Sequence, residues 1–126
     1  MKRIWIGIVL LAVLLAAGLW IGKFMEQAHV PVARDVRRAG ELALEGQWDR
    51  AKALASRGQG QWEKKRPVTA SVADHEPMEE IDGLFAQLKT YEKIRDPGAY
   101  SGACAYLASL LEAMSQSHSC KWWNLM

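Results

Sequence analysis

The chain opens with an unbroken apolar stretch. Residues 4–22 read IWIGIVLLAVLLAAGLWIG and contain no charged side chain. At about 1.5 Å per residue, a helix of this length spans the ~30 Å hydrocarbon core of a bilayer. Trp5 and Trp20 stand near the two ends, where indole rings favour the headgroup boundary, and Lys23 closes the run. The pattern predicts a transmembrane anchor.

Beyond residue 30 the apolar positions recur every three or four residues, which is typical of helices that bury one face. A first such helix is expected over residues 31–45, with Pro31 at its first position and Gly46 as its C-terminal cap and hinge. The side chains expected on its buried face are Val32, Val36, Ala39, and Leu42 or Ala43. Those expected on its wet face are Arg34, Arg37, Arg38, Glu41 and Glu45.

A second apolar stripe runs through residues 47–66. It contains Trp48, Ala51, Ala55, Gly58 and Trp62. Because glycine weakens a helix, Gly58 and Gly60 indicate a bend or a close contact with another helix. Pro67 is expected to start a new turn or to kink this helix. The apolar stripe beyond it is predicted to continue through Val68, Val72 and His75.

The strongest amphipathic pattern covers residues 78–94, after a break at residues 74–77 that places Pro77 at the helix start. Its apolar positions are Ile81, Leu84, Phe85, Leu88 and Tyr91. A last helix is predicted with Asp96 as its N-terminal cap and Pro97 as its first residue, ending in the polar segment after Ser115. Its buried positions are Tyr100, Ala103, Cys104, Leu107, Leu110, Leu111 and Met114.

No stretch alternates apolar and polar residues, so no sheet is expected. We therefore predict an all-α protein, with one N-terminal transmembrane helix followed by a small antiparallel bundle of three to four helices. The expected divisions are a cytoplasmic start at 1–3, the anchor at 4–22, a juxtamembrane linker at 23–30 and an extracytoplasmic bundle at 31–126.

Lys2 and Arg3 precede the apolar run, and the positive-inside rule keeps such an end in the cytoplasm. The predicted location is thus the cytoplasmic membrane, crossed once, with the C-terminal domain outside. A cleaved secretory signal is the alternative interpretation. It is disfavoured because the run exceeds the usual ~7–15 apolar residues and its small-residue site, residues 16–18, lies inside it. A lipoprotein is excluded because no cysteine directly follows residues 16–18 to accept the lipid.

Charge divides the chain into two halves. Residues 23–66 carry a net charge of +4 and residues 67–126 a net charge of −4. The favoured interpretation is attraction between antiparallel layers. The alternative places the basic half, including Lys64, Lys65 and Arg66, on anionic headgroups. Nucleic-acid binding is not expected for an exported domain with no net charge.

The chain ends in an aromatic segment, CKWWNLM. Trp122 and Trp123 either pack back on the helices, which we favour, or enter the headgroup region near the anchor. Cys104 and Cys120 are too far apart along the last helix for a disulfide. We expect Cys104 to be buried and inert and Cys120 to be free.

The best candidate for chemistry is a polar cluster around residue 79. It comprises His75, Glu76, Glu79, Glu80 and Asp82. The sequence His-Glu-x-x-Glu lacks the second histidine of the zinc-protease motif, so His75, Glu79 and Asp82 are only weak candidates for a divalent-metal site. The favoured interpretation is helix capping with His75 packed at a helix junction. No cofactor motif and no catalytic signature occurs, so we predict that the protein is not an enzyme.

Taken together, the chain resembles the domain of unknown function 4363 family. The residues that carry this resemblance are the short anchor, Trp48 and Trp62, His75, Ile81-Asp82, Tyr91, Asp96 and Asn124-Leu125. The resemblance implies a short single-pass membrane protein of a Gram-positive, often spore-forming bacterium, and it implies no activity. The chain departs from the family pattern at Pro67, Pro77 and Trp122-Trp123.

The function expected from these features is a non-enzymatic interaction or accessory module on the outer face of the cytoplasmic membrane. Its partners would be the bilayer, through residues 4–22, and another membrane or envelope protein. The alternative is a small divalent-metal-binding protein that uses His75, Glu79 and Asp82.

Overall fold

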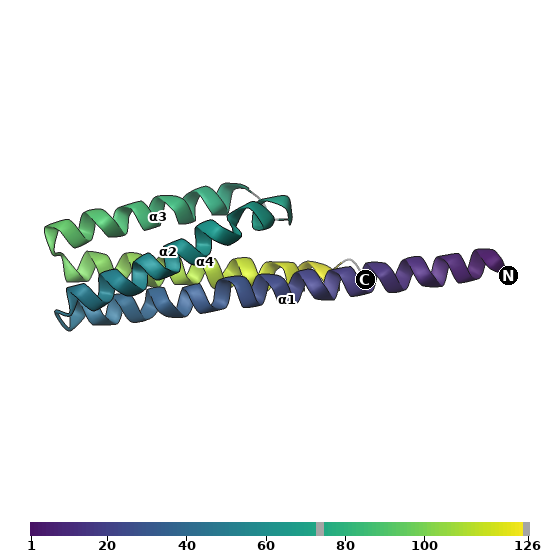
Figure 1. Ribbon diagram of the computed structural model, residues 1–126, viewed down its shortest axis with the longest axis horizontal. Coiled ribbons are helices and arrows are strands. Elements are labelled where there is room, and N and C mark those ends of the chain that lie inside the picture. The colour runs from purple at the N-terminus through teal and green to yellow at the C-terminus, as the bar shows by residue number, and fades with distance from the viewer. Residues whose placement is uncertain (73–74, 125–126) are drawn as a thin grey trace.

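A computed structural model describes the backbone of residues 1–72 and 75–124 and the side chains of residues 1–71 and 75–115. Within these residues the chain forms four helices and no strand. They are α1 (Lys2–Leu44), α2 (Trp48–Val72), α3 (His75–Ile94) and α4 (Pro97–Asn124), and consecutive helices run antiparallel (Figure 1). The predicted all-α class, an N-terminal apolar helix followed by an antiparallel bundle, is confirmed.

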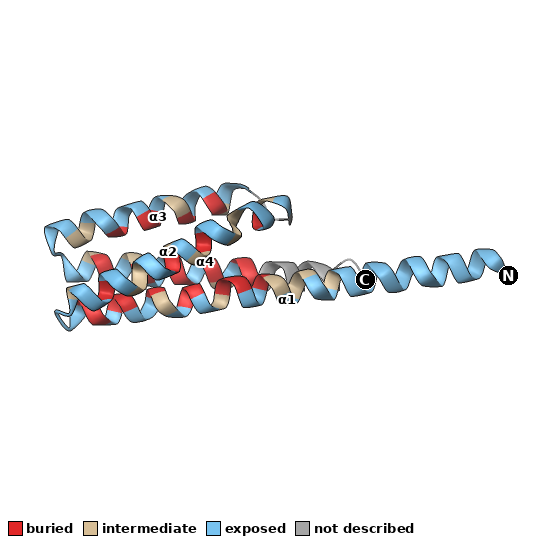
Figure 2. Ribbon diagram, in the orientation of Figure 1, coloured by how far each residue is buried: buried red, intermediate tan, exposed pale blue. Residues whose placement is uncertain are grey.

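Helix α1 is continuous over 43 residues, a length of about 65 Å. Its first half extends alone and is exposed, whereas its second half forms one edge of the bundle (Figure 2). Residues 23–30, expected to be a linker, are helical instead, and Met25, Ala28 and His29 are buried. Because these three side chains, which precede Pro31, pack in the bundle, they stabilise the helix across the boundary expected at residue 31.

Pro31 lies inside α1 and not at a helix start, which differs from the prediction. Proline removes one backbone hydrogen bond and disturbs the turn before it, at a cost of ~3 kcal/mol in a helix interior. Both Pro31 and Gln27, whose carbonyl loses its partner, are on the exposed side of the helix. Water can therefore satisfy that carbonyl while the opposite face keeps its packing.

Helix α1 ends at Leu44, and Gly46 terminates it as predicted. Gly46 has φ +79°, the left-handed region that glycine adopts without strain. Its N–H donates to the Ala43 carbonyl (3.0 Å), and the N–H of Gln47 donates to the Leu42 carbonyl (2.9 Å). This pair of bonds is the Schellman motif, which satisfies carbonyls at a helix end and reverses the chain into α2.

The core lies where α1 meets α2 and α4, while α3 packs mainly on α4 and less closely on α2. The predicted buried face of residues 31–45 is confirmed, with both Leu42 and Ala43 buried. The predicted apolar positions of α2 up to Trp62, and those of α3 and α4, also face inward. Trp48, Ala55, Tyr91, Ala103 and Leu110 are only partly buried. Local periodicity therefore placed most of the core correctly, but it did not predict the buried positions Met25, Ala28 and His29 of α1 or Thr69 of α2.

Two glycines allow helices to approach closely. A Cβ added at Gly40 would lie 3.0 Å from the Cys104 Cβ and 3.3 Å from the Ser101 Cα, both on α4. A Cβ at Gly58 would lie 3.4 Å from a methyl of Val36 on α1, so the predicted close contact is confirmed there. Gly60 has no neighbour within 4 Å of such a Cβ, so it marks no contact.

Helix α2 continues through Pro67, where a break or kink was predicted. Because the helix does not restart, the buried position after Trp62 is Thr69 and not Val68, which is 47 % exposed. His75 is exposed at the start of α3, so the predicted stripe beyond Pro67 was wrong at both positions. The side chain of Val72 lies outside the described residues.

Helix α4 begins as predicted and ends later than predicted. The Ala99 N–H donates to Asp96 Oδ1 (3.0 Å), which confirms Asp96 as the cap before Pro97. The helix then continues past Ser115 to Asn124. The predictions for Cys120, Trp122 and Trp123 concern side chains outside the described part of the structure.

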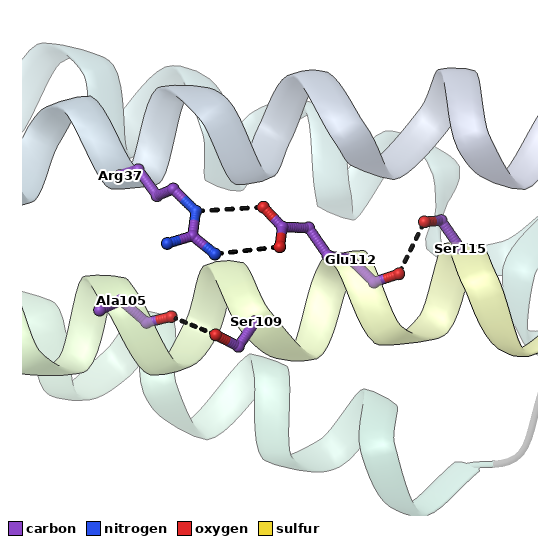
Figure 3. Close-up of polar contacts among 5 residues, drawn as sticks. All are labelled: Arg37, Ala105, Ser109, Glu112 and Ser115. Atoms are coloured by element: carbon purple, nitrogen blue, oxygen red, sulfur yellow. Dashed lines mark hydrogen bonds and ion pairs between the residues drawn. The ribbon is translucent and has the colours of Figure 1, made fainter.

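The two halves of opposite charge are joined by ion pairs. Three of those among the described residues connect a base in residues 23–66 with an acid in residues 67–126: Arg37–Glu112, Lys52–Glu92 and Arg66–Asp82. The Arg37 guanidinium donates to both Glu112 carboxylate oxygens at 3.1 and 3.0 Å, bridging α1 and α4 (Figure 3). Because this pair is half-exposed, it contributes at most about 1 kcal/mol and serves to fix the helix register.

Candidate functional site

The connections α1–α2 and α3–α4 lie together at the end of the bundle farthest from the exposed apolar half of α1 (Figure 1). We call this end the distal tip, formed by residues 44–50 and 94–95. It contains an open hollow of about 380 Å³. The residues that line the hollow are Gly46, Gln47, Trp48, Asp49, Arg50 and Arg95.

The distal tip is built around Trp48, the first residue of α2. Its ring meets that of Tyr100 edge to face, with centroids 5.2 Å apart and an interplanar angle of 75°. The Arg95 guanidinium carbon lies 5.3 Å from the Trp48 ring centroid, within cation–π distance. Residues from α2, α4 and the α3–α4 connection thus converge on one half-buried indole.

Arg95 reaches this position through an unusual backbone conformation. Its φ of 54° is left-handed, which costs a non-glycine residue roughly 1–2 kcal/mol. The Arg95 N–H donates to the Glu92 carbonyl and the Asp96 N–H to the Tyr91 carbonyl, both at 3.2 Å. This second Schellman motif ends α3 and places the arginine over Trp48 where a glycine is the usual residue.

Two large apolar side chains are exposed at the distal tip. Leu44 is 60 % exposed and Ile94 is 63 % exposed. Arg50 donates to the Gln47 side chain (2.8 Å) on the same rim. The hollow's lining carries no hydroxyl, thiol or imidazole. It offers the aromatic face of Trp48, the guanidinium groups of Arg50 and Arg95, the Asp49 carboxylate and the Gln47 amide.

Tyr100 forms the floor of the distal tip and is 1 % exposed. Burial, together with the nearby Cys104 and Glu92, raises the pKa of its phenol well above the usual range. Burial also raises the pKa of the Cys104 thiol to about 12. Both groups are therefore neutral at physiological pH, and Cys104 is a buried free thiol, as predicted.

A second group of polar residues joins three helices nearer to the apolar segment. Trp62 Nε1 donates to Asp82 Oδ1 (2.7 Å), and Arg66 donates to Asp82 Oδ2 (2.9 Å). On its other side the Trp62 ring lies 5.4 Å from the ring of buried His29, whose Nε2 is 3.3 Å from the Thr69 hydroxyl. These contacts connect α1, α2 and α3 and stabilise the bundle.

The predicted metal cluster is not assembled as a site. His75, Glu76 and Glu79 are exposed on the first turns of α3, so His75 does not pack at a helix junction as we favoured. Asp82 is occupied by its bonds to α2. Among the residues that the structure describes, no group of three or more acidic, histidine or cysteine side chains is positioned to hold a metal ion.

Glu80, the remaining member of that cluster, accepts a hydrogen bond from the Tyr106 hydroxyl of α4. This bond raises the pKa of the Tyr106 phenol, since ionisation would place two negative groups together. Glu80 therefore connects α3 with α4.

Sequence reasoning missed two residues, Arg95 and His29. His29 is in phase with Met25, Val32 and Val36, and that signal was obscured by the break expected at Pro31. No sequence signal marks Arg95, because its role depends on a left-handed backbone and on an indole that is 47 positions earlier in the chain.

These features define a class of protein: an antiparallel helical bundle whose first helix extends into one apolar segment of sufficient length and hydropathy to cross a membrane. Residues 19–125 match the family described as Domain of unknown function (DUF4363), and the chain belongs to that family. Searches of curated proteins and of solved structures give no match.

Proposed function

We propose that this protein is a non-enzymatic interaction module, anchored in the cytoplasmic membrane by residues 4–22, that presents its distal tip to another membrane or envelope protein. The N-terminus lies inside and the bundle outside, in keeping with Lys2 and Arg3 before the apolar run. A partner protein then meets the distal tip at the outer surface.

The observation that carries this proposal is the continuity of α1. The apolar segment, whose exposed side chains suit a lipid environment, leads without interruption into the helix that supplies Met25 and Val32 to the core. Because the helix has no joint, it holds the distal tip at a fixed height above the membrane. From Lys23 to Leu44 this height is about 32 Å.

The composition of the distal tip supports protein recognition. Exposed large apolar side chains that cluster next to polar groups mark interaction surfaces. Arginine and tryptophan are also the residue types most enriched among those that dominate binding energy. Leu44, Ile94, Trp48 and Arg95 provide this combination within one end of the bundle.

Site-specific photocrosslinking tests the proposal. A photoreactive amino acid replaces Ile94 in the full-length protein, which is expressed in its native host and irradiated in intact cells. We expect one dominant protein adduct. The matched control carries the same group at Gly83, about three turns earlier on the same face of α3, where the backbone is exposed and a side chain meets open space.

The adduct should also be lost when Leu44→Glu is added, because a charge at this exposed position disturbs recognition without touching the core. Ala53→Glu, on the exposed face of α2, should leave the adduct intact. Equal labelling from residues 83 and 94, or an adduct that survives Leu44→Glu, would reject the distal tip as the binding surface.

A further inference from the structure

The end of the bundle opposite the distal tip, which we call the base, is formed where α2 ends, α3 begins and α4 ends (Figure 1). Contacts show how far α2 runs along α1. Gly58 packs against Val32 and Val36, and Thr69 reaches His29. With a rise of 1.5 Å per residue in both antiparallel helices, the end of α2 is level with about residues 20–26 of α1.

Helix α4 reaches the same level. Gly40 of α1 faces Ser101 and Cys104 of α4, and α4 then continues to Asn124. Counting equal rises from these contacts places residues 121–124 level with about residues 17–23 of α1. Figure 1 shows α4 returning along α1 to the region where the exposed segment begins.

That region of α1 is the end of the apolar run, from Trp20 to Lys23. Met25, only two residues beyond Lys23, is already fully buried in the bundle. No spacer therefore separates the anchor from the bundle, and the base is at the level where the headgroups of a bilayer would be. Among the described side chains near the end of α2, Val68 is a large exposed apolar one, and the contacts between α2 and α1 described above place it level with about residues 24–30 of α1, just beyond Lys23.

We propose that the base rests on the bilayer and contacts the headgroup layer through the last turns of α2 and α4, as a second lipid contact besides the anchor. This inference rests on the proposed anchoring of residues 4–22. The last turn of α4 carries the sequence Lys121-Trp122-Trp123-Asn124, and tryptophan and lysine are residue types that favour the membrane interface.

The expected contact is apolar and aromatic in character. Exposed charges near the base are of both signs and include Lys23, Glu26, Lys64, Glu76 and Glu79. Contact should therefore form on phosphatidylcholine alone and should not require an anionic lipid.

Fluorescence quenching by lipid tests this inference. The full-length protein with Cys120→Ser receives a single cysteine at residue 71, labelled with an environment-sensitive dye and reconstituted into phosphatidylcholine vesicles. Cys104 does not compete for the dye because it is buried. The matched control is a label at residue 53, about five turns earlier on the same exposed face of α2 and about 27 Å nearer the distal tip. A label at residue 7 reports on the anchor.

Lipid with a quencher on its headgroup should reduce the fluorescence of a label at residue 71, and of one at residue 124, and leave residue 53 unchanged. Lipid with a quencher deep in its acyl chain should reduce the fluorescence of residue 7. If the label at residue 71 is no more quenched than the label at residue 53, while the label at residue 7 is quenched, the base does not contact the membrane and the inference is wrong. If residue 7 is not quenched, the anchoring itself is wrong. A label at Val68 repeats the test should the Ser71 variant fail to fold.

Discussion

The close approach of α1 and α4 at Gly40 predicts that replacing this glycine with alanine lowers the stability of the protein. Helix propensity alone predicts the opposite. Alanine is a better helix former than glycine by up to about 1 kcal/mol, so Gly→Ala in an open position stabilises a helix. At Gly60 no atom lies within 4 Å of the added Cβ. Gly60→Ala should therefore raise the melting temperature.

At Gly40 the same methyl meets atoms that cannot move away by changing rotamer. Its nearest neighbours, the Cys104 Cβ at 3.0 Å and the Ser101 Cα at 3.3 Å, are fixed to the α4 backbone. Overpacking of this kind costs about 1–3 kcal/mol, which exceeds or matches the gain in propensity. We expect Gly40→Ala to be less stable than the native chain by up to about 2 kcal/mol, and less stable than Gly60→Ala by about 1–3 kcal/mol.

Thermal unfolding of both full-length variants in the same detergent, followed by far-ultraviolet circular dichroism, measures this difference. Removing the facing Cβ with Cys104→Gly should reduce the cost of Gly40→Ala, a coupling that only neighbouring residues show. If the melting temperature of Gly40→Ala equals or exceeds that of Gly60→Ala, then α1 and α4 are not in close contact at Gly40. The position of the end of α4 along α1, which was derived from this contact, would then be wrong.

Three further outcomes are expected. Trp62→Ala and Leu88→Ala should each lower the free energy of unfolding by about 2–5 kcal/mol, because both side chains are buried; an unchanged denaturation midpoint in either variant would place the core elsewhere. Arg95→Gly should relieve the left-handed strain, raise thermal stability by up to about 1 kcal/mol and weaken the photo-adduct at the distal tip. The pKa of Cys104 is raised from 9.0 to about 12 in the folded protein, so unfolding favours ionisation of the thiol. Stability should therefore fall between about pH 9 and pH 12 more steeply in the native chain than in Cys104→Ala. Parallel pH profiles of stability in the two proteins would contradict this.

Sequence periodicity was sufficient to place the buried faces because it depends only on neighbours along one helix. Val32, Val36 and Ala39 follow the helical repeat whatever they pack against, and the caps at Gly46 and Asp96 are equally local. The α-class and most of the core residues were therefore accessible before any tertiary contact was known.

The prolines show where local reasoning failed. The cost of proline inside a helix led us to expect a helix start at Pro31 and a new turn or a kink at Pro67. In the structure, buried partners on both sides of each proline, such as His29 and Val32 around Pro31, stabilise a continuous helix. Tertiary packing overrides the local preference because each proline faces outward.

The site predictions failed for a related reason. The spacing of His75, Glu79 and Asp82 indicates only which side chains share a helix. Asp82 instead binds Trp62 and Arg66 of the preceding helix, and the pairing of helix faces that brings them together is not encoded in residue spacing. The distal tip depends likewise on two chain reversals meeting at one end.

Under the proposed anchoring of residues 4–22, the continuity of α1 couples the orientation of the bundle rigidly to that of the anchor. Transmembrane helices tilt by about 20° on average, and with about 32 Å of rigid helix beyond the membrane this tilt displaces the distal tip sideways by about 11 Å. Rotation of the anchor about its own axis turns the whole bundle by the same angle. The lateral position and facing direction of the distal tip are thus set within the lipid, by whatever packs against residues 4–22.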